Sequence, residues 1–202
     1  MSLDASDRKI VRLFCACVLG RWDVALEVRR SADGREPDRR WREALLQVHV
    51  FAGFPRGVEA YGVLRGAGGL GTPDEDESKA GDTLASDTAR GRALFERIYR
   101  ADAPRVRAML AESHSDFAAW IEDHAYGRVL ARPGLAADRR ELLAVVALAA
   151  LGQEKQLASH ARGAVRTGAT PEDVMEALAA VADLMTSERY ARARSIVEQF
   201  AR

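Results

Sequence analysis

The amino-acid sequence predicts an all-α fold built from two degenerate tandem helical repeats. Alanine, leucine, arginine and glutamate, which favour helices, are abundant in the 202 residues, and only six prolines interrupt them. Alternating runs of valine, isoleucine and threonine, which are typical of strands, are missing. We expect one repeat in residues 1–66 and the other in residues 91–202, with a flexible linker in residues 67–90.

The first repeat begins with an apolar helix, IVRLFCACVLG, that ends at the turn residue Gly20. A second helix, a short glycine-containing loop and a third helix with Glu43 follow. Cys15 and Cys17 lie two residues apart in the first helix, which turns their side chains about 200° from each other and prevents a disulfide. We interpret them as small buried side chains in a reducing compartment, with a reactive thiol at either position as the alternative.

The linker is predicted from a stretch that combines glycines, a proline and the acidic run from Asp74 to Glu77 with almost no apolar residues. A solvated spacer is the favoured interpretation, and an interaction tail for a basic partner is the alternative. Amphipathic segments follow and predict two or three helices that end at the turn of Pro133 and Gly134: GRALFERIY, APRVRAMLAES and DFAAWIEDHAYGRVLA.

The second repeat shows the same order of features. The ten-residue apolar run Leu142–Leu151 is about half as long as a membrane span and predicts a buried helix that ends at Gly152. A helix near Glu154–Thr167 follows, and a Thr-Pro pair at residues 170–171 caps and opens a third helix, which carries Glu176.

The two copies align with a single gap. The turn residues Gly20 and Gly152 are 132 positions apart, and Glu43 and Glu176 are 133 positions apart. This spacing predicts a duplicated unit that buries its apolar faces against its twin.

The charge balance and the residue spacings argue against several classes of protein. Thirty basic and thirty acidic residues give a formal net charge of zero, which argues against nucleic-acid binding driven by overall charge. The first residues, MSLDASDRK, lack the apolar core of a secretory signal, and no apolar run is long enough for a membrane span, so we expect a cytoplasmic protein. The histidine and cysteine spacings match no familiar zinc pattern and no phosphate loop is found, so we expect neither a metal nor a cofactor.

His160 and Glu141 form the candidate acid/base pair. His160 lies three residues after Leu157 and four before Ala164, on the apolar side of its helix, so its ring is expected to point inward. Glu141 begins the preceding helix, and in an antiparallel hairpin around Gly152 the two side chains stand at similar depth. A carboxylate beside an inward imidazole is suited to proton transfer, and a structural core histidine is the alternative.

A series of short features runs from Tyr126 to Ala180: YG at 126–127, RPGL at 132–135, Arg140, the helix ending in LAALG, QL at 156–157 with His160, RGAVRTGAT, and EDVMEAL. The first repeat adds WREALLQVHVFAGFP, with an aromatic-Ala-Gly-x-Pro motif at residues 51–55. Together these features resemble the carboxymuconolactone decarboxylase family, which includes alkyl-hydroperoxidase proteins of the AhpD type.

The resemblance implies an all-helical fold that assembles into a homo-oligomer, a trimer or a hexamer, with sites near helix and subunit interfaces. The peroxidase branch has cysteines four and seven residues before the histidine, where this sequence has Gln156 and Gln153, so thiol peroxidase chemistry at that position is excluded. Glu141 and His160 match the carboxylate and histidine of that branch's proton relay. The decarboxylase branch needs no cysteine, and its histidine is consistent with a general acid/base.

Two departures divide the family's features between the repeats. Val28 stands where the first copy would have the histidine, and the second copy ends in DLMTSERYARA where the family has its aromatic-Ala-Gly-x-Pro motif. Either the features reunite across the interface of the two halves, or the site is degenerate.

These observations predict a cofactor-free, decarboxylase-like lyase that acts on a small cyclic or unsaturated carboxylic acid. His160 is expected to be the general acid/base, Glu141 its orienter or proton relay, and Arg132 or Arg140 a clamp for the substrate carboxylate. A surface position without a role is the alternative for Arg140.

Two other functions stay open at this point. One is a peroxiredoxin-like, alkylhydroperoxidase-type antioxidant activity through Cys15 or Cys17. The other is a non-catalytic, oligomeric binding member of the family.

Overall fold

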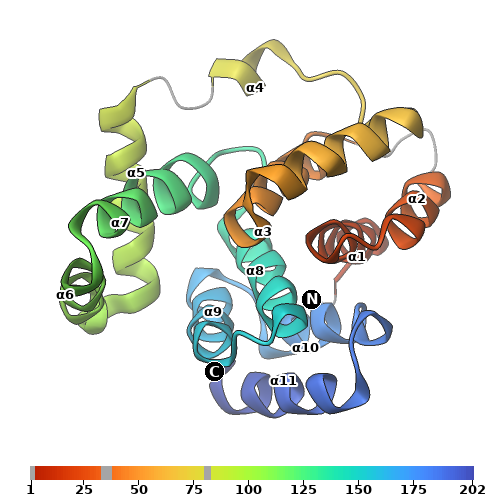
Figure 1. Cartoon of the computed structure of the whole chain (residues 1–202). Coiled ribbons are helices and arrows are strands. Elements are labelled where there is room, and N and C mark those ends of the chain that lie inside the picture. Colours follow the sequence, from red (N-terminus) through yellow and green to blue (C-terminus); the bar gives the residue numbers. More distant parts are fainter. Residues whose placement is uncertain (1–2, 33–37, 80–82) are drawn as a thin grey trace.

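A computed structural model describes residues 3–32, 38–79 and 83–202, and every regular element in these residues is helical (Figure 1). The predicted all-α fold is confirmed. The glycine-containing loop predicted between the second and third helices falls mostly on residues 33–37, outside the described residues, as do residues 80–82 of the predicted linker.

The N-terminal helices are α1 (Ala5–Leu19), α2 (Trp22–Ser31) and α3 (Arg39–Gly66). Helix α1 starts at an Asp4 side chain that accepts a hydrogen bond from the backbone of Asp7, and it ends at Gly20, whose φ of 71° is left-handed. Helix α3 is kinked at Gly53, where φ is 80° and ψ is 163°, so its C-terminal part leaves in a new direction.

Helix α4 (Glu75–Lys79) contacts α3 through the ion pair of Glu77 with Arg42. The following helices form a smaller group: α5 (Leu84–Tyr99), η1 (Arg100–Asp102), α6 (Ala103–Ser113), α7 (Ser115–Trp120) and the π-helical η2 (Ile121–Leu130). Helix α5 crosses η2 at Gly91 and Gly127, where a Cβ on either residue would lie 2.5 Å from a backbone oxygen of the other element. The predicted linker therefore contains α4 and the first turns of α5.

The C-terminal helices are α8 (Ala137–Leu151), α9 (Glu154–Thr167), α10 (Pro171–Ala179), η3 (Ala182–Leu184) and α11 (Ser187–Phe200). Thr170 caps α10 by accepting a hydrogen bond from the Asp173 backbone, as the Thr-Pro pair predicts.

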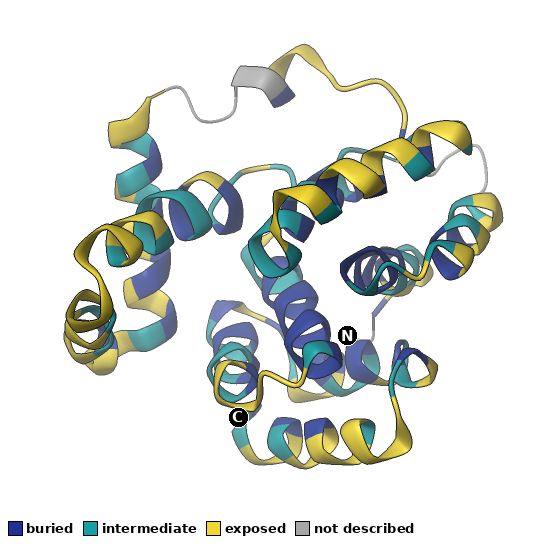
Figure 2. Ribbon diagram, viewed as in Figure 1, coloured by how far each residue is buried: buried dark blue, intermediate teal, exposed yellow. Residues whose placement is uncertain are grey.

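Helix α8 is the centre of the fold. All its residues from Arg140 to Ala150 are buried, and α1, α3, α9, α10 and α11 pack around it (Figures 1 and 2). The predicted buried helix is thus confirmed, and across the described residues no helix combines the length and apolar character needed to cross a membrane. Because α8 has neighbours on every side, polar side chains on it must find partners inside the protein.

Candidate active site

Glu141 and His160 are brought together by the hairpin of α8 and α9. Gly152 closes this hairpin with a left-handed φ of 73°, and the two helices return side by side. The Nδ1 atom of His160 lies 2.8 Å from Oε2 of Glu141. The carboxylate is 1% exposed and the imidazole 12%, so the pair lies in the interior with only the histidine reaching toward solvent.

The neighbouring residue Gly163 makes room for the carboxylate. A Cβ atom at position 163 would lie 2.5 Å from Oε2 of Glu141 and 3.3 Å from Cγ2 of Ile98. Any larger side chain one turn after His160 would therefore push Glu141 away from the imidazole.

The hydrogen bond fixes which ring nitrogen of His160 can exchange a proton. A carboxylate oxygen accepts, so Nδ1–H donates the hydrogen bond to Glu141, and Nε2 is the ring atom that takes up or releases a proton. Burial of the ring favours its neutral form, but the charge and the hydrogen bond of Glu141 favour the imidazolium. The pKa of His160 is therefore raised above its ordinary value of 6.5.

Replacing Glu141 with glutamine is expected to lower the pKa of His160 to below 6.5, because burial then acts without the opposing carboxylate. In the wild type the folded-state pKa is the higher one, so the pair's contribution to stability is complete below pH 6.5 and is lost as the pH rises through the folded-state pKa. NMR titration of the His160 ring in both proteins checks this. Identical titration curves would contradict the coupling.

The second oxygen of Glu141 has an unusual environment. Its Oε1 atom is buried and has no hydrogen-bond partner among the described residues. Nearby, the hydroxyl of Tyr126 donates to that of Tyr99 across 3.1 Å. Burial raises the pKa of both phenols and the charge of Glu141 adds to the effect, so both stay protonated. The carboxylate thus keeps an acceptor position that a proton donor can use.

The first half of the chain contributes aromatic rings that pack beside His160. The Phe51 ring meets the His160 ring edge to face, with centroids 6.3 Å apart, and meets Phe14 in the same way at 6.1 Å. The aromatic-Ala-Gly-x-Pro segment that begins at Phe51 thus lies beside the histidine of the second half. This arrangement agrees with the sequence-based alternative in which the divided features reunite between the halves.

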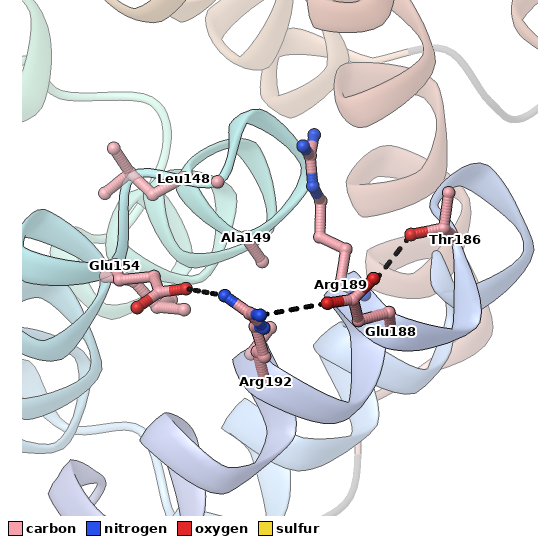
Figure 3. A pocket seen from close by; sticks show the side chains of 10 residues that line it. Leu148, Ala149, Glu154, Thr186, Glu188, Arg189 and Arg192 are labelled. Atoms are coloured by element: carbon pink, nitrogen blue, oxygen red, sulfur yellow. Dashed lines mark hydrogen bonds and ion pairs between the residues drawn. The ribbon is translucent and has the colours of Figure 1, made fainter.

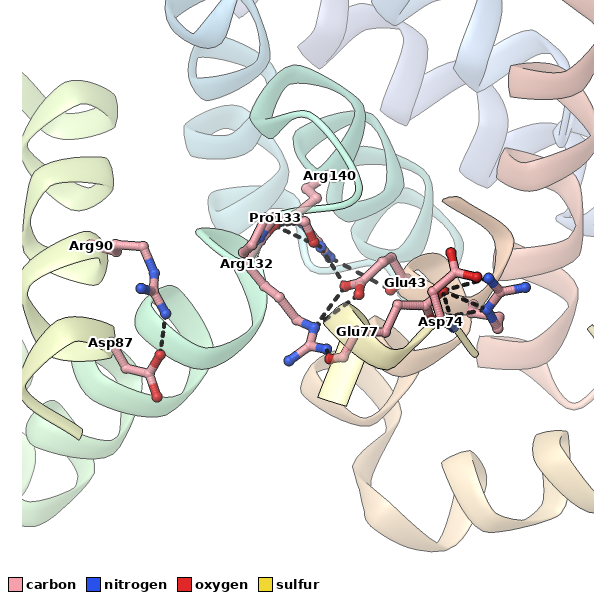
Figure 4. A network of polar contacts seen from close by, with 9 residues as sticks. Glu43, Asp74, Glu77, Asp87, Arg90, Arg132, Pro133 and Arg140 are labelled. Atoms are coloured by element: carbon pink, nitrogen blue, oxygen red, sulfur yellow. Dashed lines mark hydrogen bonds and ion pairs between the residues drawn. The ribbon is translucent and has the colours of Figure 1, made fainter. Parts of the chain in front are cut away.

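Arg132 and Arg140 both form ion pairs with Glu43. Figure 4 shows the contacts of both guanidinium groups converging on Glu43, at 2.9 Å from Nε of Arg132 and 2.7 Å from Nη2 of Arg140. Arg132 also donates to the backbone oxygen of Glu77, whose carboxylate binds Arg42. The arrangement gives both arginines an ion-pair role, and the carboxylate clamp stays a prediction.

The alternative that places Arg140 on the surface is wrong. Its side chain is 0% exposed and also donates to the backbone oxygens of Arg132 and Pro133. Burial lowers the pKa of Arg140, and the Glu43 carboxylate opposes this effect. The ion pair of Arg140 with Glu43 could not be predicted from the sequence pattern, because the two residues lie 97 positions apart.

A pair of histidines that the sequence did not single out joins α3 to η2. The Nδ1 atom of His49 lies 2.6 Å from the backbone oxygen of Leu46, and because a carbonyl oxygen can only accept, Nδ1–H is the donor. The other ring nitrogen of His49, Nε2, then accepts a hydrogen bond from Nε2–H of His124 at 2.9 Å. Burial and the neighbouring His49 and Arg128 lower the pKa of His124. The described residues hold no group of three or more histidine, cysteine or acidic side chains arranged for a metal ion.

Cys15 and Cys17 are both fully buried, without a disulfide. Burial raises the pKa of each thiol to about 12, so neither forms the thiolate that peroxide reduction needs.

Both thiols are therefore expected to resist Ellman's reagent in the native protein at mildly alkaline pH, and to react once the chain is unfolded in guanidinium. Rapid labelling of either thiol in the native protein would restore the reactive-cysteine alternative.

A separate pocket of about 270 Å³ lies between α8, α9 and α11 (Figure 3). Arg192 lies in it between Glu154 and Glu188, at 3.7 Å and 2.9 Å. His160 and Glu141 are not among the residues that line this pocket.

The comparison with family models matches the part of the chain that carries this site. The model of the carboxymuconolactone decarboxylase family matches residues 115–199, which include both Glu141 and His160. This segment belongs to the carboxymuconolactone decarboxylase family. Its family membership covers the helix hairpin that holds the acid/base pair, whereas Phe51 and Glu43 lie outside the match.

Two curated relatives extend the comparison. Peroxisomal protein 2 of Schizosaccharomyces pombe is 32% identical over 138 residues, which cover 67% of this chain and 64% of that protein. The 4-carboxymuconolactone decarboxylase of Acinetobacter baylyi is 36% identical over 67 residues, which cover 33% of this chain and 50% of that enzyme. The chain therefore spans less than two thirds of each relative that it matches.

Proposed function

We propose that the protein is a cofactor-free lyase that decarboxylates a small cyclic or unsaturated carboxylic acid. The observation that carries this proposal is the buried Glu141 carboxylate, 2.8 Å from Nδ1 of a histidine whose other ring nitrogen can exchange a proton. The buried thiols supply no comparable group for redox chemistry.

The proposed reaction needs one proton transfer. The bond between the substrate carbon and its carboxylate breaks, carbon dioxide leaves, and the electron pair passes into the conjugated system of the substrate. The His160 imidazolium donates its Nε2 proton to the carbon that receives this electron pair, and solvent then reprotonates the ring. Glu141 stabilises the imidazolium, and the raised pKa of His160 increases the fraction of the ring in the acid form.

The experiment that tests the proposal is a measurement of carbon dioxide release by the purified chain. The first substrate is 4-carboxymuconolactone, which the name of the Acinetobacter relative suggests, followed by other small lactone and unsaturated acids. We expect activity that survives replacement of both cysteines by alanine. Peroxide reduction that disappears in the same double variant would instead support the antioxidant alternative.

The duplicated unit is also part of the proposal. The paired helices α1 and α8, α2 and α9, and α3 and α10 begin 132 positions apart, at the residue pairs Ala5 and Ala137, Trp22 and Glu154, and Arg39 and Pro171. The part of α3 after its kink corresponds to α11. Such constant spacing supports two copies of one four-helix unit, with the middle helices inserted between them.

Ion pairs between the halves support the same duplication. Arg140 of α8 binds Glu43 of α3, and Arg8 of α1 binds Glu176 of α10 at 3.0 Å. The two arginines are 132 positions apart and the two glutamates 133. Each half thus gives the other an equivalent ion pair, as two copies related by an approximate two-fold axis would.

A homo-oligomer, a trimer or a hexamer, remains our expectation for the assembly. Helix α3 exposes Phe54, Val58 and Tyr61 at spacings of four and three, which places them on one face. An apolar stripe of this kind supports a contact between subunits.

A further inference from the structure

His49 and His124 form the one hydrogen bond between side chains of α3 and η2 in the part of the chain that the structure describes. His49 lies two residues before Phe51 on α3, and the Phe51 ring packs against that of His160, with centroids 6.3 Å apart. The Phe54 ring stacks on that of His49, with centroids 4.7 Å and planes 14° apart. The histidine pair therefore connects the part of α3 beside the candidate active site to the middle helices.

The pair can take up one proton, but not two, without losing its hydrogen bond. In the neutral pair, Nε2–H of His124 donates to Nε2 of His49 across 2.9 Å. After one proton is added, His49 can donate from Nε2, while His124 carries its own proton on Nδ1 and accepts at Nε2. With a second proton both Nε2 atoms carry hydrogen and both rings are cationic. No hydrogen bond is then possible, and two like charges face each other.

No acidic group compensates for the second charge. Neither ring has a carboxylate partner among the described residues, and Arg128 of η2 adds a positive charge near His124. The acidic residues of the elements that pack together here are engaged in other contacts, apart from the exposed Asp116 of α7: Glu59 with Arg56 on α3, Asp87 with Arg90 on α5, Glu122 of η2 with Arg107, Asp123 of η2 with Thr88, and Glu141 of α8 with His160.

The pKa of His124 shows the direction of this effect. Burial, the neighbouring His49 and Arg128 all lower it below its ordinary value of 6.5. The folded-state pKa is the lower one, so the stability that neutral His124 contributes is present above pH 6.5. It is lost as the pH falls from 6.5 through the folded-state pKa. The second proton therefore acts in acidic solution.

We propose that double protonation of His49 and His124 opens the contact between α3 and η2, and so loosens the segment that places Phe51 against His160. The aromatic ring that packs on both histidines, Phe54, is 67% exposed and buries little apolar surface, so the contact depends on the hydrogen bond. The consequence for catalysis rests on the proposed function, whereas the opening of the contact does not.

The test is amide hydrogen exchange of the full chain at neutral pH and at about pH 5, corrected for the intrinsic effect of pH on exchange. Residues 46–55 and 121–130 are expected to lose protection at acidic pH, while the central helix α8 keeps it. The variant His124→Gln should keep its protection at both pH values. Its amide can donate to neutral His49, and its oxygen can accept from protonated His49.

A control and a second measurement make the test specific. His114→Asn removes an exposed histidine outside the pair and should respond to acid as the wild type does. NMR titration of the wild type should show two coupled steps for His49 and His124, the second below pH 6.5. The proposal is overturned by unchanged protection of the wild type at acidic pH, by an equal loss in His124→Gln, or by independent titration of both rings. Because no substrate is present, a failure of the proposed lyase function leaves these outcomes unaffected.

Discussion

Replacing His160 with asparagine is expected to lower kcat for decarboxylation by about 10²- to 10⁴-fold, the usual contribution of a general acid. Asparagine can keep a hydrogen bond to the Glu141 carboxylate, but its amide cannot donate a proton to carbon. Glu141→Gln is expected to lower kcat as well, because the neutral amide no longer stabilises the imidazolium. Carbon dioxide release under saturating substrate measures both effects.

A matched control separates this loss from a general loss of structure. His114 is exposed at the start of α7, where its ring accepts a hydrogen bond from the Asp116 backbone. Asparagine is a good helix cap, so His114→Asn should keep both fold and activity. Full activity of a folded His160→Asn protein would show that the histidine is structural and would remove the proposed mechanism.

Removing the charge of Glu43 is expected to destabilise the protein by about 3–5 kcal/mol, the cost of leaving a buried ion without its partner. Glu43 is 2% exposed, and it forms ion pairs with both the fully buried Arg140 and the mostly buried Arg132. The variant Glu43→Gln keeps the shape of the side chain and removes the charge. Urea denaturation measures the free energy of unfolding.

Two comparisons make this experiment specific. Glu198→Gln breaks the exposed pair with Arg194, whose N–O distance is 2.8 Å, and should cost far less stability because solvent screens this pair. Combining Glu43→Gln with Arg140→Met should recover part of the stability, because one buried charge is removed with its partner. A loss in Glu43→Gln as small as that in Glu198→Gln would contradict the structural role of the network.

The Glu43 network also has a consequence for the candidate site. Arg140 directly precedes Glu141 on α8, so the ion pair that anchors Arg140 to α3 also fixes the turn of helix that carries the carboxylate. Partial unfolding at this point would move Glu141 away from His160. Activity and stability should therefore fall together in Glu43 variants, whereas His160→Asn should lower activity by a much larger factor than its loss of stability accounts for.

The sequence by itself determined the parts of the protein that depend on neighbours along the chain. The apolar run before Gly152, the capped start at Thr170 and the inward position of His160 follow from helix periodicity and from turn and cap residues. A hairpin with a short turn has one register, so the approach of Glu141 to His160 could be predicted from their distances to the glycine.

Only the tertiary structure decided the contacts between distant segments. Glu43 meets Arg140 across 97 residues, His49 meets His124 across 75, and Phe51 lies on the ring of His160. Helix periodicity says which face of a helix is apolar, but not which partner covers it or which buried charge neutralises another. Those choices depend on how the helices pack around α8, where the buried Arg140 and Glu141 are paired by side chains from other helices.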